Sequence, residues 1–77
     1  MLIDSIVEAQ AQRGWNDGDL CRQMGVSQSV WSRIRRGLRP LDNVPFLRAV
    51  ARVLPELKWQ VAEYILEGGN TDNADTN

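Results

Sequence analysis

The short connection between two helical segments is the feature that most restricts the fold of this chain. Residues 17–24 and 28–36 both carry apolar side chains at the three- and four-residue spacing of amphipathic helices, and only Gly25-Val26-Ser27 separates them. Gly25 can take a positive φ at little cost, and Ser27 is a favourable N-cap. Two helices joined by so short a turn meet at a steep angle, so we expect the second to project outward.

Helical spacing also precedes this pair, and no strand-like alternation appears along the chain. Residues 2–13 predict a first helix that stops at Gly14. Asn16 is then the predicted N-cap of helix 17–24, with Asp19 as its partner in a capping box.

A fourth helix is predicted after the N-cap Asn43, and a fifth after Pro55. Gly68-Gly69 should end the fifth helix, and the residues that follow are polar and acidic. We therefore expect an all-α domain of five helices over residues 1–68 and a disordered polar tail over residues 69–77.

Composition argues against several classes of function. The chain of 77 residues contains one cysteine, Cys21, and no histidine. An intrachain disulfide, a zinc site of Cys and His ligands and a Cys–His nucleophile are therefore excluded. Paired acids at a catalytic spacing and a phosphate-binding loop are also missing, so we expect no enzyme, cofactor, metal or small-molecule ligand. Cys21 is expected to be a small buried apolar residue.

No apolar run approaches the roughly 20 residues of a membrane span. The first twelve residues carry two acids and no base, unlike the basic start of a signal peptide. We therefore expect a cytoplasmic protein that does not enter the membrane.

The formal net charge is −1, but the charges are unevenly distributed. Residues 20–41 contain five arginines and no acid, whereas both flanking segments are acidic. The arginines are Arg22, Arg33, Arg35, Arg36 and Arg39. Such a segment can attract phosphate groups over about 8 Å at physiological salt, although the pattern also fits an ordinary solvated arginine face.

The two faces of predicted helix 28–36 differ in character. At about 100° per residue, Val30, Trp31 and Ile34 fall on one side and polar residues on the other. The polar side consists of Gln28, Ser29, Ser32, Arg33 and Arg36. Gln can pair with an adenine edge, Arg can pair with guanine N7 and O6, and Ser can bond bases or phosphate, so this side holds a combination that can read DNA in the major groove.

The remaining arginines of this region have other expected roles. Arg36 and Arg39 are expected to hold DNA phosphates, with solvation as the alternative. Arg35 lies near the edge of the helical wheel, where it could instead pair with an acid.

The stretch GWNDGDLCRQMGVSQSVWSRIRRG resembles the lambda-repressor-like (Xre-type) helix-turn-helix family, and the resemblance covers residues 14–57. Its strongest part is MGVSQSVWSRIRRG, and FLRAVARVL is similar to the fourth helix of the family. The resemblance implies a helix-turn-helix at about residues 17–36 within a five-helix domain. It also implies base contacts from Gln28, Ser29, Ser32 and Arg33. Phosphate contacts are implied near Asn16, Asp17, Arg39 and Asn43.

Three residues depart from the family pattern. Cys21 stands where the family usually has Ala, and Trp31 replaces a smaller aliphatic residue, so the core must adapt. Asp17 stands where the family usually has Gln, often near a phosphate. A carboxylate at that position is unfavourable for a phosphate contact.

We therefore predict a sequence-specific transcriptional regulator, a repressor of phage or mobile-element type, that reads a pseudo-palindromic operator in double-stranded DNA. Trp59, Tyr64 and Leu66 in the last helix predict a homodimer interface, because at least Trp59 lies off the stripe that faces the core. A wider buried face would also explain these three residues. The alternative function is a protein-interaction module of antitoxin or host-inhibitor type, which the slight negative charge and Asp17 favour.

Overall fold

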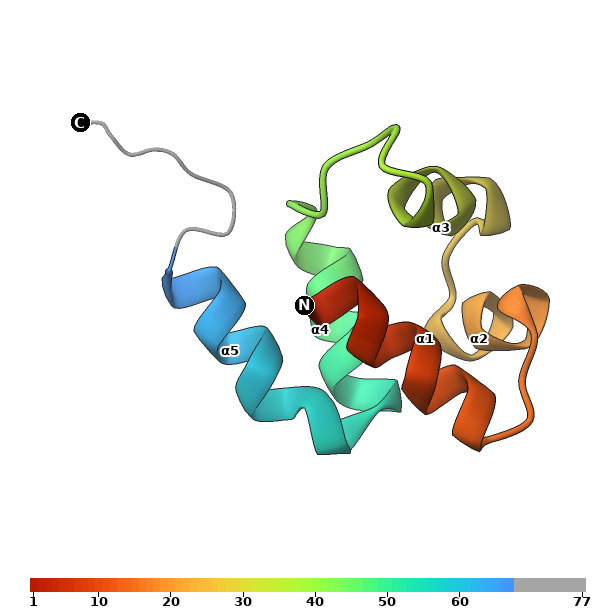
Figure 1. The fold of residues 1–77 in the computed structure, drawn as a ribbon, viewed down its shortest axis with the longest axis horizontal. Helices are drawn as coiled ribbons and strands as arrows, with labels where there is room; N and C mark the ends of the chain where they lie inside the picture. The colour runs from red at the N-terminus through yellow and green to blue at the C-terminus, as the bar shows by residue number, and fades with distance from the viewer. Residues whose placement is uncertain (68–77) are drawn as a thin grey trace.

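The computed structural model describes residues 1–67, which form five α-helices and one short 3-10 helix (Figure 1). The helices are α1 (Leu2–Gln12), α2 (Asp17–Met24), α3 (Gln28–Arg35), α4 (Val44–Val53) and α5 (Lys58–Leu66), with the 3-10 helix η1 (Pro55–Leu57) before the last. No strand occurs within these 67 residues. The expected all-α fold is therefore confirmed, whereas the predicted tail, residues 69–77, lies outside the described residues.

Local signals in the sequence determine the ends of α2. Asn16 Oδ1 accepts a hydrogen bond from Asp19 N (2.8 Å), and Asp19 Oδ2 accepts one from Asn16 N (3.0 Å), which completes the predicted capping box. Gly25 ends the helix at a φ of 71°, in the left-handed region that favours glycine. Ser27 then caps α3 by accepting a hydrogen bond from Ser29 N. The turn between the two helices therefore forms as predicted.

Helix α3 ends one residue earlier than predicted. Arg36 is its C-cap, with a ψ of 4°, and Gly37 follows at a φ of +74°. Leu38 N then donates to Arg33 O (2.9 Å), which satisfies a carbonyl at the end of the helix. The chain therefore leaves the helix at Arg36 and turns toward α4.

The core takes buried side chains from all five α-helices. The largest fully buried ones are Ile6, Leu20, Trp31, Ile34, Val50 and Leu54. Trp31, the bulky departure from the family pattern, stacks on Phe46 of α4 with a centroid distance of 5.7 Å and an interplanar angle of 28°. Cys21 is buried, as predicted. An aromatic pair thus joins α3 and α4 in the core.

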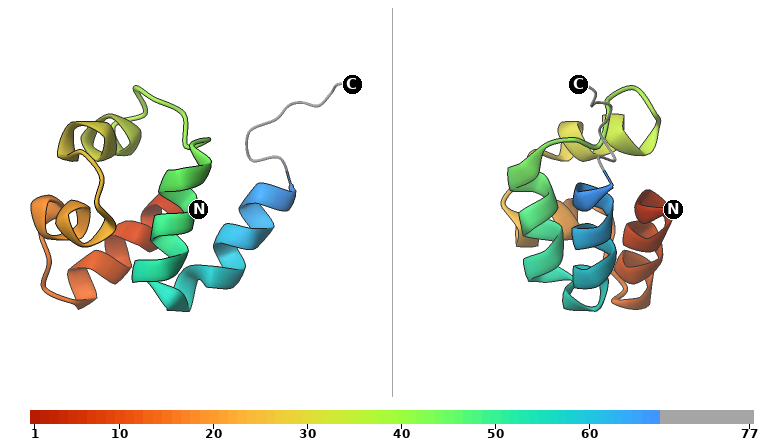
Figure 2. Two further views of the ribbon diagram at one scale, coloured as in Figure 1. Left: turned by 180° about the vertical axis from the view of Figure 1, so that it is seen from behind. Right: turned by 90° about the vertical axis from the view of Figure 1, so that its left-hand side faces the viewer.

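Helix α3 occupies an outer position in the molecule. Helices α2 and α3 lie on one side of α1 and α4, and α5 lies on the other (Figures 1 and 2). None of the other described elements covers the outer side of α3 in these views. No helix within residues 1–67 has the length and apolar character needed to cross a bilayer.

Helix α5 buries only some of its apolar residues. Val61 is buried, and Leu57, which belongs to η1, is buried too. Ile65 and Leu66 are 43% and 85% exposed, because α5 diverges from α4 toward its end (Figure 1). Of the apolar residues in this last segment, Leu57 and Val61 therefore face the core, and Ile65 and Leu66 do not.

Candidate nucleic-acid interface

Helix α3 is held by its inner face and open on its outer face. Trp31 and Ile34 are completely buried, and Val30 packs against the core beside them. Three of the four predicted base-contacting residues are exposed, and one is partly buried. The exposed ones are Gln28, Ser29 and Arg33, and the partly buried one is Ser32. The outer surface therefore offers amide, hydroxyl and guanidinium groups on a firmly anchored helix.

Asp17, at the start of α2, joins three helices. Its Oδ1 accepts hydrogen bonds from Gln10 Nε2 of α1 (2.9 Å) and from Trp31 Nε1 of α3 (3.1 Å). Arg35 Nη1 of α3 lies 2.7 Å from Oδ1 and 2.8 Å from Oδ2. This single carboxylate therefore fixes the position of α3 relative to α1 and α2.

The contacts of Asp17 also determine its charge. Burial alone would raise the pKa of Asp17, but hydrogen bonds from Gln10, Arg35 and Trp31, together with the positive charge of Arg35, lower it. Asp17 is therefore ionised at neutral pH and already saturated with donors. A phosphate contact by its side chain, which the family resemblance implies for this region, would bring two anions together. The alternative role of Arg35, an ion pair with an acid, is confirmed.

The arginines near α3 fall into two groups. Arg22 and Arg35 pair with acids of α2, namely Asp19 and Asp17. A second group is exposed and forms no ion pair within residues 1–67. This group consists of Arg33, Arg36 and Arg39. The cations available to a phosphate or a base are thus on the outer side of α3 and in the loop that follows it.

The two asparagines predicted to contact phosphate are helix caps. Asn16 Oδ1 accepts from Asp19 N, and Asn43 Oδ1 accepts from Phe46 N (3.0 Å). Because the oxygen of each amide is used, the NH₂ group is left as the donor to a ligand. Each of these donors lies at the N-terminal, positive end of a helix. Both residues are therefore suited to a phosphate oxygen.

The contacts of Asp17 with α1 and α3 were missed by sequence reasoning, which considered this residue only in relation to a phosphate and to the alternative function. A signal was present, because Trp31 and Arg35 are one turn apart on α3 and place two donors on the same face of the helix. The acceptor could not be identified from spacing alone, since it comes from another helix. Gln10 of α1 was missed for the same reason.

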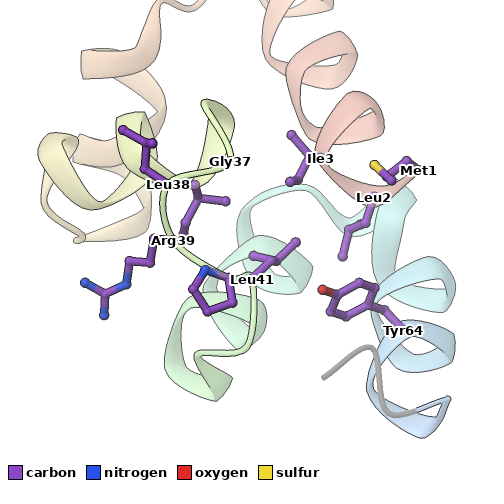
Figure 3. A pocket seen from close by; sticks show the side chains of 10 residues that line it. Met1, Leu2, Ile3, Gly37, Leu38, Arg39, Leu41 and Tyr64 are labelled. Atoms are coloured by element: carbon purple, nitrogen blue, oxygen red, sulfur yellow. The ribbon is translucent and has the colours of Figure 1, made fainter. Parts of the chain in front are cut away.

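A groove of about 430 Å³ lies beside the end of α3, between the start of α1, the α3–α4 loop and α5 (Figure 3). Leu2, Leu38 and Leu41 are among the apolar residues that line it. The Tyr64 ring points toward the loop, and the Arg39 side chain points away from α1 (Figure 3). Tyr64 is thus only partly exposed, whereas Trp59 and Leu66, predicted for the same interface, are 78% and 85% exposed.

Among residues 1–67, no group of three or more Cys, Asp or Glu side chains could hold a metal ion. Comparisons with protein-family models, with curated protein sequences and with solved structures give no match. Function must therefore be inferred from the residues and geometry of this chain.

Proposed function

We propose that this protein is a sequence-specific DNA-binding regulator with a lambda-repressor-like helix-turn-helix, in which α2 crosses the DNA backbone and α3 enters the major groove. The observation that supports it most is the outer face of α3. It is exposed and acid-free, and two fully buried side chains, Trp31 and Ile34, anchor it from behind. A rigid helix with such a face is the usual reader of base edges.

Each outer residue has a role that follows from its chemistry. Arg33 pairs with guanine N7 and O6, and Gln28 with an adenine edge. Ser29 and Ser32 donate to or accept from either bases or phosphate, with Ser32 at the partly buried edge of the face. These contacts supply sequence preference, while contacts to the backbone fix the register of the protein on the duplex.

Phosphate contacts come from both sides of α3. The amide groups of Asn16 and Asn43 donate from the N-terminal ends of α2 and α4. Arg36 and Arg39 supply positive charge at the end of α3 and in the loop after it. The overall charge of −1 does not oppose this arrangement, because residues 20–41 contain no acidic residue. The nearby acids Asp17 and Asp19 are paired with arginines.

The regulator acts as a homodimer that reads a pseudo-palindromic operator and represses by occupying a promoter, as phage or mobile-element repressors do. Trp59 and Leu66 on α5 support this part, because large apolar side chains that are 78% and 85% exposed favour burial against a partner. Tyr64, the third predicted residue, instead lines the groove and is only partly exposed. Two half-sites about 34 Å apart would then share one binding event.

Selection of bound duplexes from a random pool, followed by sequencing, tests the proposal. An enriched sequence motif is expected. Arg33→Ala should then cost roughly 1–3 kcal/mol at one base position and relax the preference there. Arg39→Ala should weaken binding to all sequences alike and reduce the salt slope by about 0.9. Equal loss on every sequence for Arg33→Ala would refute its role as a base reader.

Lys58→Ala is the matched control for these arginine variants. Lys58 starts α5, on the other side of the molecule from α3, and its removal deletes one positive charge (Figure 1). It should leave both the sequence preference and the salt slope unchanged. Loss of binding in this variant equal to that of Arg39→Ala would mean that total charge, not the α3 surface, determines the affinity.

A protein-interaction module of antitoxin or host-inhibitor type is the second candidate. The apolar groove beside the α3–α4 loop favours it, with an apolar segment of a partner protein as the occupant. A gel-shift titration with duplex DNA at two salt concentrations separates the candidates. Absence of salt-dependent binding favours the interaction module, and salt-dependent binding favours the regulator.

A further inference from the structure

Arg35 and Arg36 are neighbours in sequence but differ in their contacts. Together with Asp17 and Ser32 they line one hollow at the edge of the outer face of α3. Arg35 is bound to both carboxylate oxygens of Asp17, and its guanidinium carbon lies 5.9 Å from the Trp31 ring centroid. Arg36 forms no ion pair with the part of the chain that the structure describes. Arg35 is thus held in an ion pair, whereas the adjacent Arg36 forms none with residues 1–67.

We propose that Asp17 withholds Arg35 from DNA and thereby acts as a specificity-determining and positioning residue of the reading surface. This inference rests on the proposed function, because it concerns which cations reach the duplex. Asp17 holds α3 in place through Trp31 and Arg35, and it reserves the outer face for the residues that distinguish bases. Arg36 and Arg39 remain as the phosphate-binding arginines.

Withholding one arginine from DNA preserves sequence preference, because phosphate contacts do not distinguish sequences. A guanidinium that binds a phosphate strengthens binding to every sequence equally, and so lowers the relative weight of base contacts. Asp17 neutralises one such group at the edge of the interface.

The first experiment compares Arg35→Gln with its matched control Arg36→Gln in the full chain. Both variants lose one positive charge at adjacent positions. Binding to a random-sequence duplex is titrated between 50 and 200 mM salt. The salt slope of Arg36→Gln should fall by about 0.9, which makes its affinity roughly 3.5-fold less sensitive to the fourfold salt change. The salt slope of Arg35→Gln should equal that of the wild type. An equal fall in both variants would overturn the proposal.

The second experiment releases Arg35. Asp17→Asn keeps a side-chain oxygen that can accept from Gln10 and Trp31, but it removes the charge that holds Arg35. Affinity for the random duplex should rise roughly three- to tenfold, with a salt slope steeper by about 0.9. The ratio of affinity for the selected motif to affinity for the random duplex should fall. In the double variant Asp17→Asn with Arg35→Gln, the gain in affinity for the random duplex should disappear.

A purely structural role for Asp17 gives a different result. Asp17→Asn would then lower the melting temperature and weaken binding to both duplexes with an unchanged salt slope, which would overturn the inference. Failure of the proposed function is distinguishable, because the wild type itself would then show no salt-dependent binding to either duplex. Should Asp17→Asn not fold, the comparison of Arg35→Gln with Arg36→Gln still decides the question, since it leaves Asp17 intact.

Discussion

Gln28 lies against Gly18 at the junction of α2 and α3. A Cβ added to Gly18 would lie 3.4 Å from Gln28 Oε1 and 3.3 Å from Asn16 Oδ1. The backbone of Gly18 is helical, so its lack of a side chain is not required by φ. The glycine instead leaves space for the Gln28 amide over the first turn of α2.

Gly18→Ala should separate stability from sequence preference. Alanine in place of a helical glycine favours the folded state by roughly 0.5–1 kcal/mol, which corresponds to a melting temperature higher by about 2–8 °C for a domain of this size. The new methyl group should displace the exposed Gln28 amide by a few tenths of an ångström. A higher melting temperature by circular dichroism, with weaker preference at the base that Gln28 is proposed to read, is the expected result.

A double-mutant comparison tests whether Gly18 acts through its contact with Gln28. If Gly18 acts on base reading through Gln28, then Gly18→Ala should not change the base preference in a Gln28→Ala background. A change of the same size in both backgrounds would assign the effect to the Asn16 cap instead. A lower melting temperature in Gly18→Ala would also point to a damaged cap.

The ion pair between α1 and η1 predicts an acid-labile part of the stability. Arg13 binds both oxygens of Glu56, with Nη2–Oε1 at 2.9 Å. The hydrogen bonds from Arg13 are the main cause that lowers the pKa of Glu56 from 4.5 to about 2. A carboxylate with a depressed pKa stabilises the folded state above its unfolded pKa and loses this effect as pH falls through its folded pKa.

Glu56→Gln should therefore be less stable than the wild type at pH 7, by less than about 1 kcal/mol because the pair is partly exposed and screened. The difference in melting temperature should be constant above about pH 5 and should vanish between about pH 4.5 and pH 2. Glu63→Gln is the control, since Glu63 forms no ion pair within residues 1–67. A difference that persists below pH 2 would contradict the assignment to the Arg13 pair.

Cys21 should report global unfolding. Its side chain is buried between the helices, and burial, together with the nearby charge of Asp17, raises the pKa of its thiol above 9.0. In the native state, an aromatic disulfide reagent at pH 8 should react only when the protein opens. The rate should rise with urea along the same transition as circular dichroism. A fast reaction without denaturant would mean that α2 detaches independently of the core.

Leu66→Glu should convert the proposed dimer into a monomer. Leu66 is 85% exposed, so the substitution should not disturb the core, but it should place a charge in the interface. Sedimentation velocity at micromolar concentrations measures the change. Leu38→Glu is the control, because Leu38 is also exposed (67%) but lies in the α3–α4 loop. A wild-type monomer at high micromolar concentration would refute the interface on α5.

The helices could be predicted from sequence where the signals are local. The bounds of α2 follow from the Asn16 capping box and from Gly25, and both features form as expected. The end of α5 was less predictable, because the exposure of Ile65 depends on how far the helix diverges from α4. Apolar spacing identifies which residues could face a core, but the packing angle between helices decides how many of them do.

Part of the candidate interface could be predicted from sequence, and part could not. The exposed positions of Gln28, Ser29 and Arg33 follow from helical periodicity, since the buried pair on the same helix fixes its orientation. The contact between Asp17 and Arg35 does not follow from periodicity, because it depends on the distance between two helices. A long side chain at the edge of a helical wheel can reach either solvent or a neighbouring helix, and spacing alone does not distinguish these outcomes.

The buried and exposed sides of α3 consist of different residues, so the exposed residues can be replaced without changing the buried ones. Its inward side uses only Trp31 and Ile34 at full burial, and Gln28, Ser29 and Arg33 on the side turned to solvent are exposed. Replacing the solvent-facing residues together would therefore change the surface that α3 presents while the remainder folds as before. The helix is in this sense an exchangeable part, and libraries randomised at those positions should yield folded proteins at high frequency.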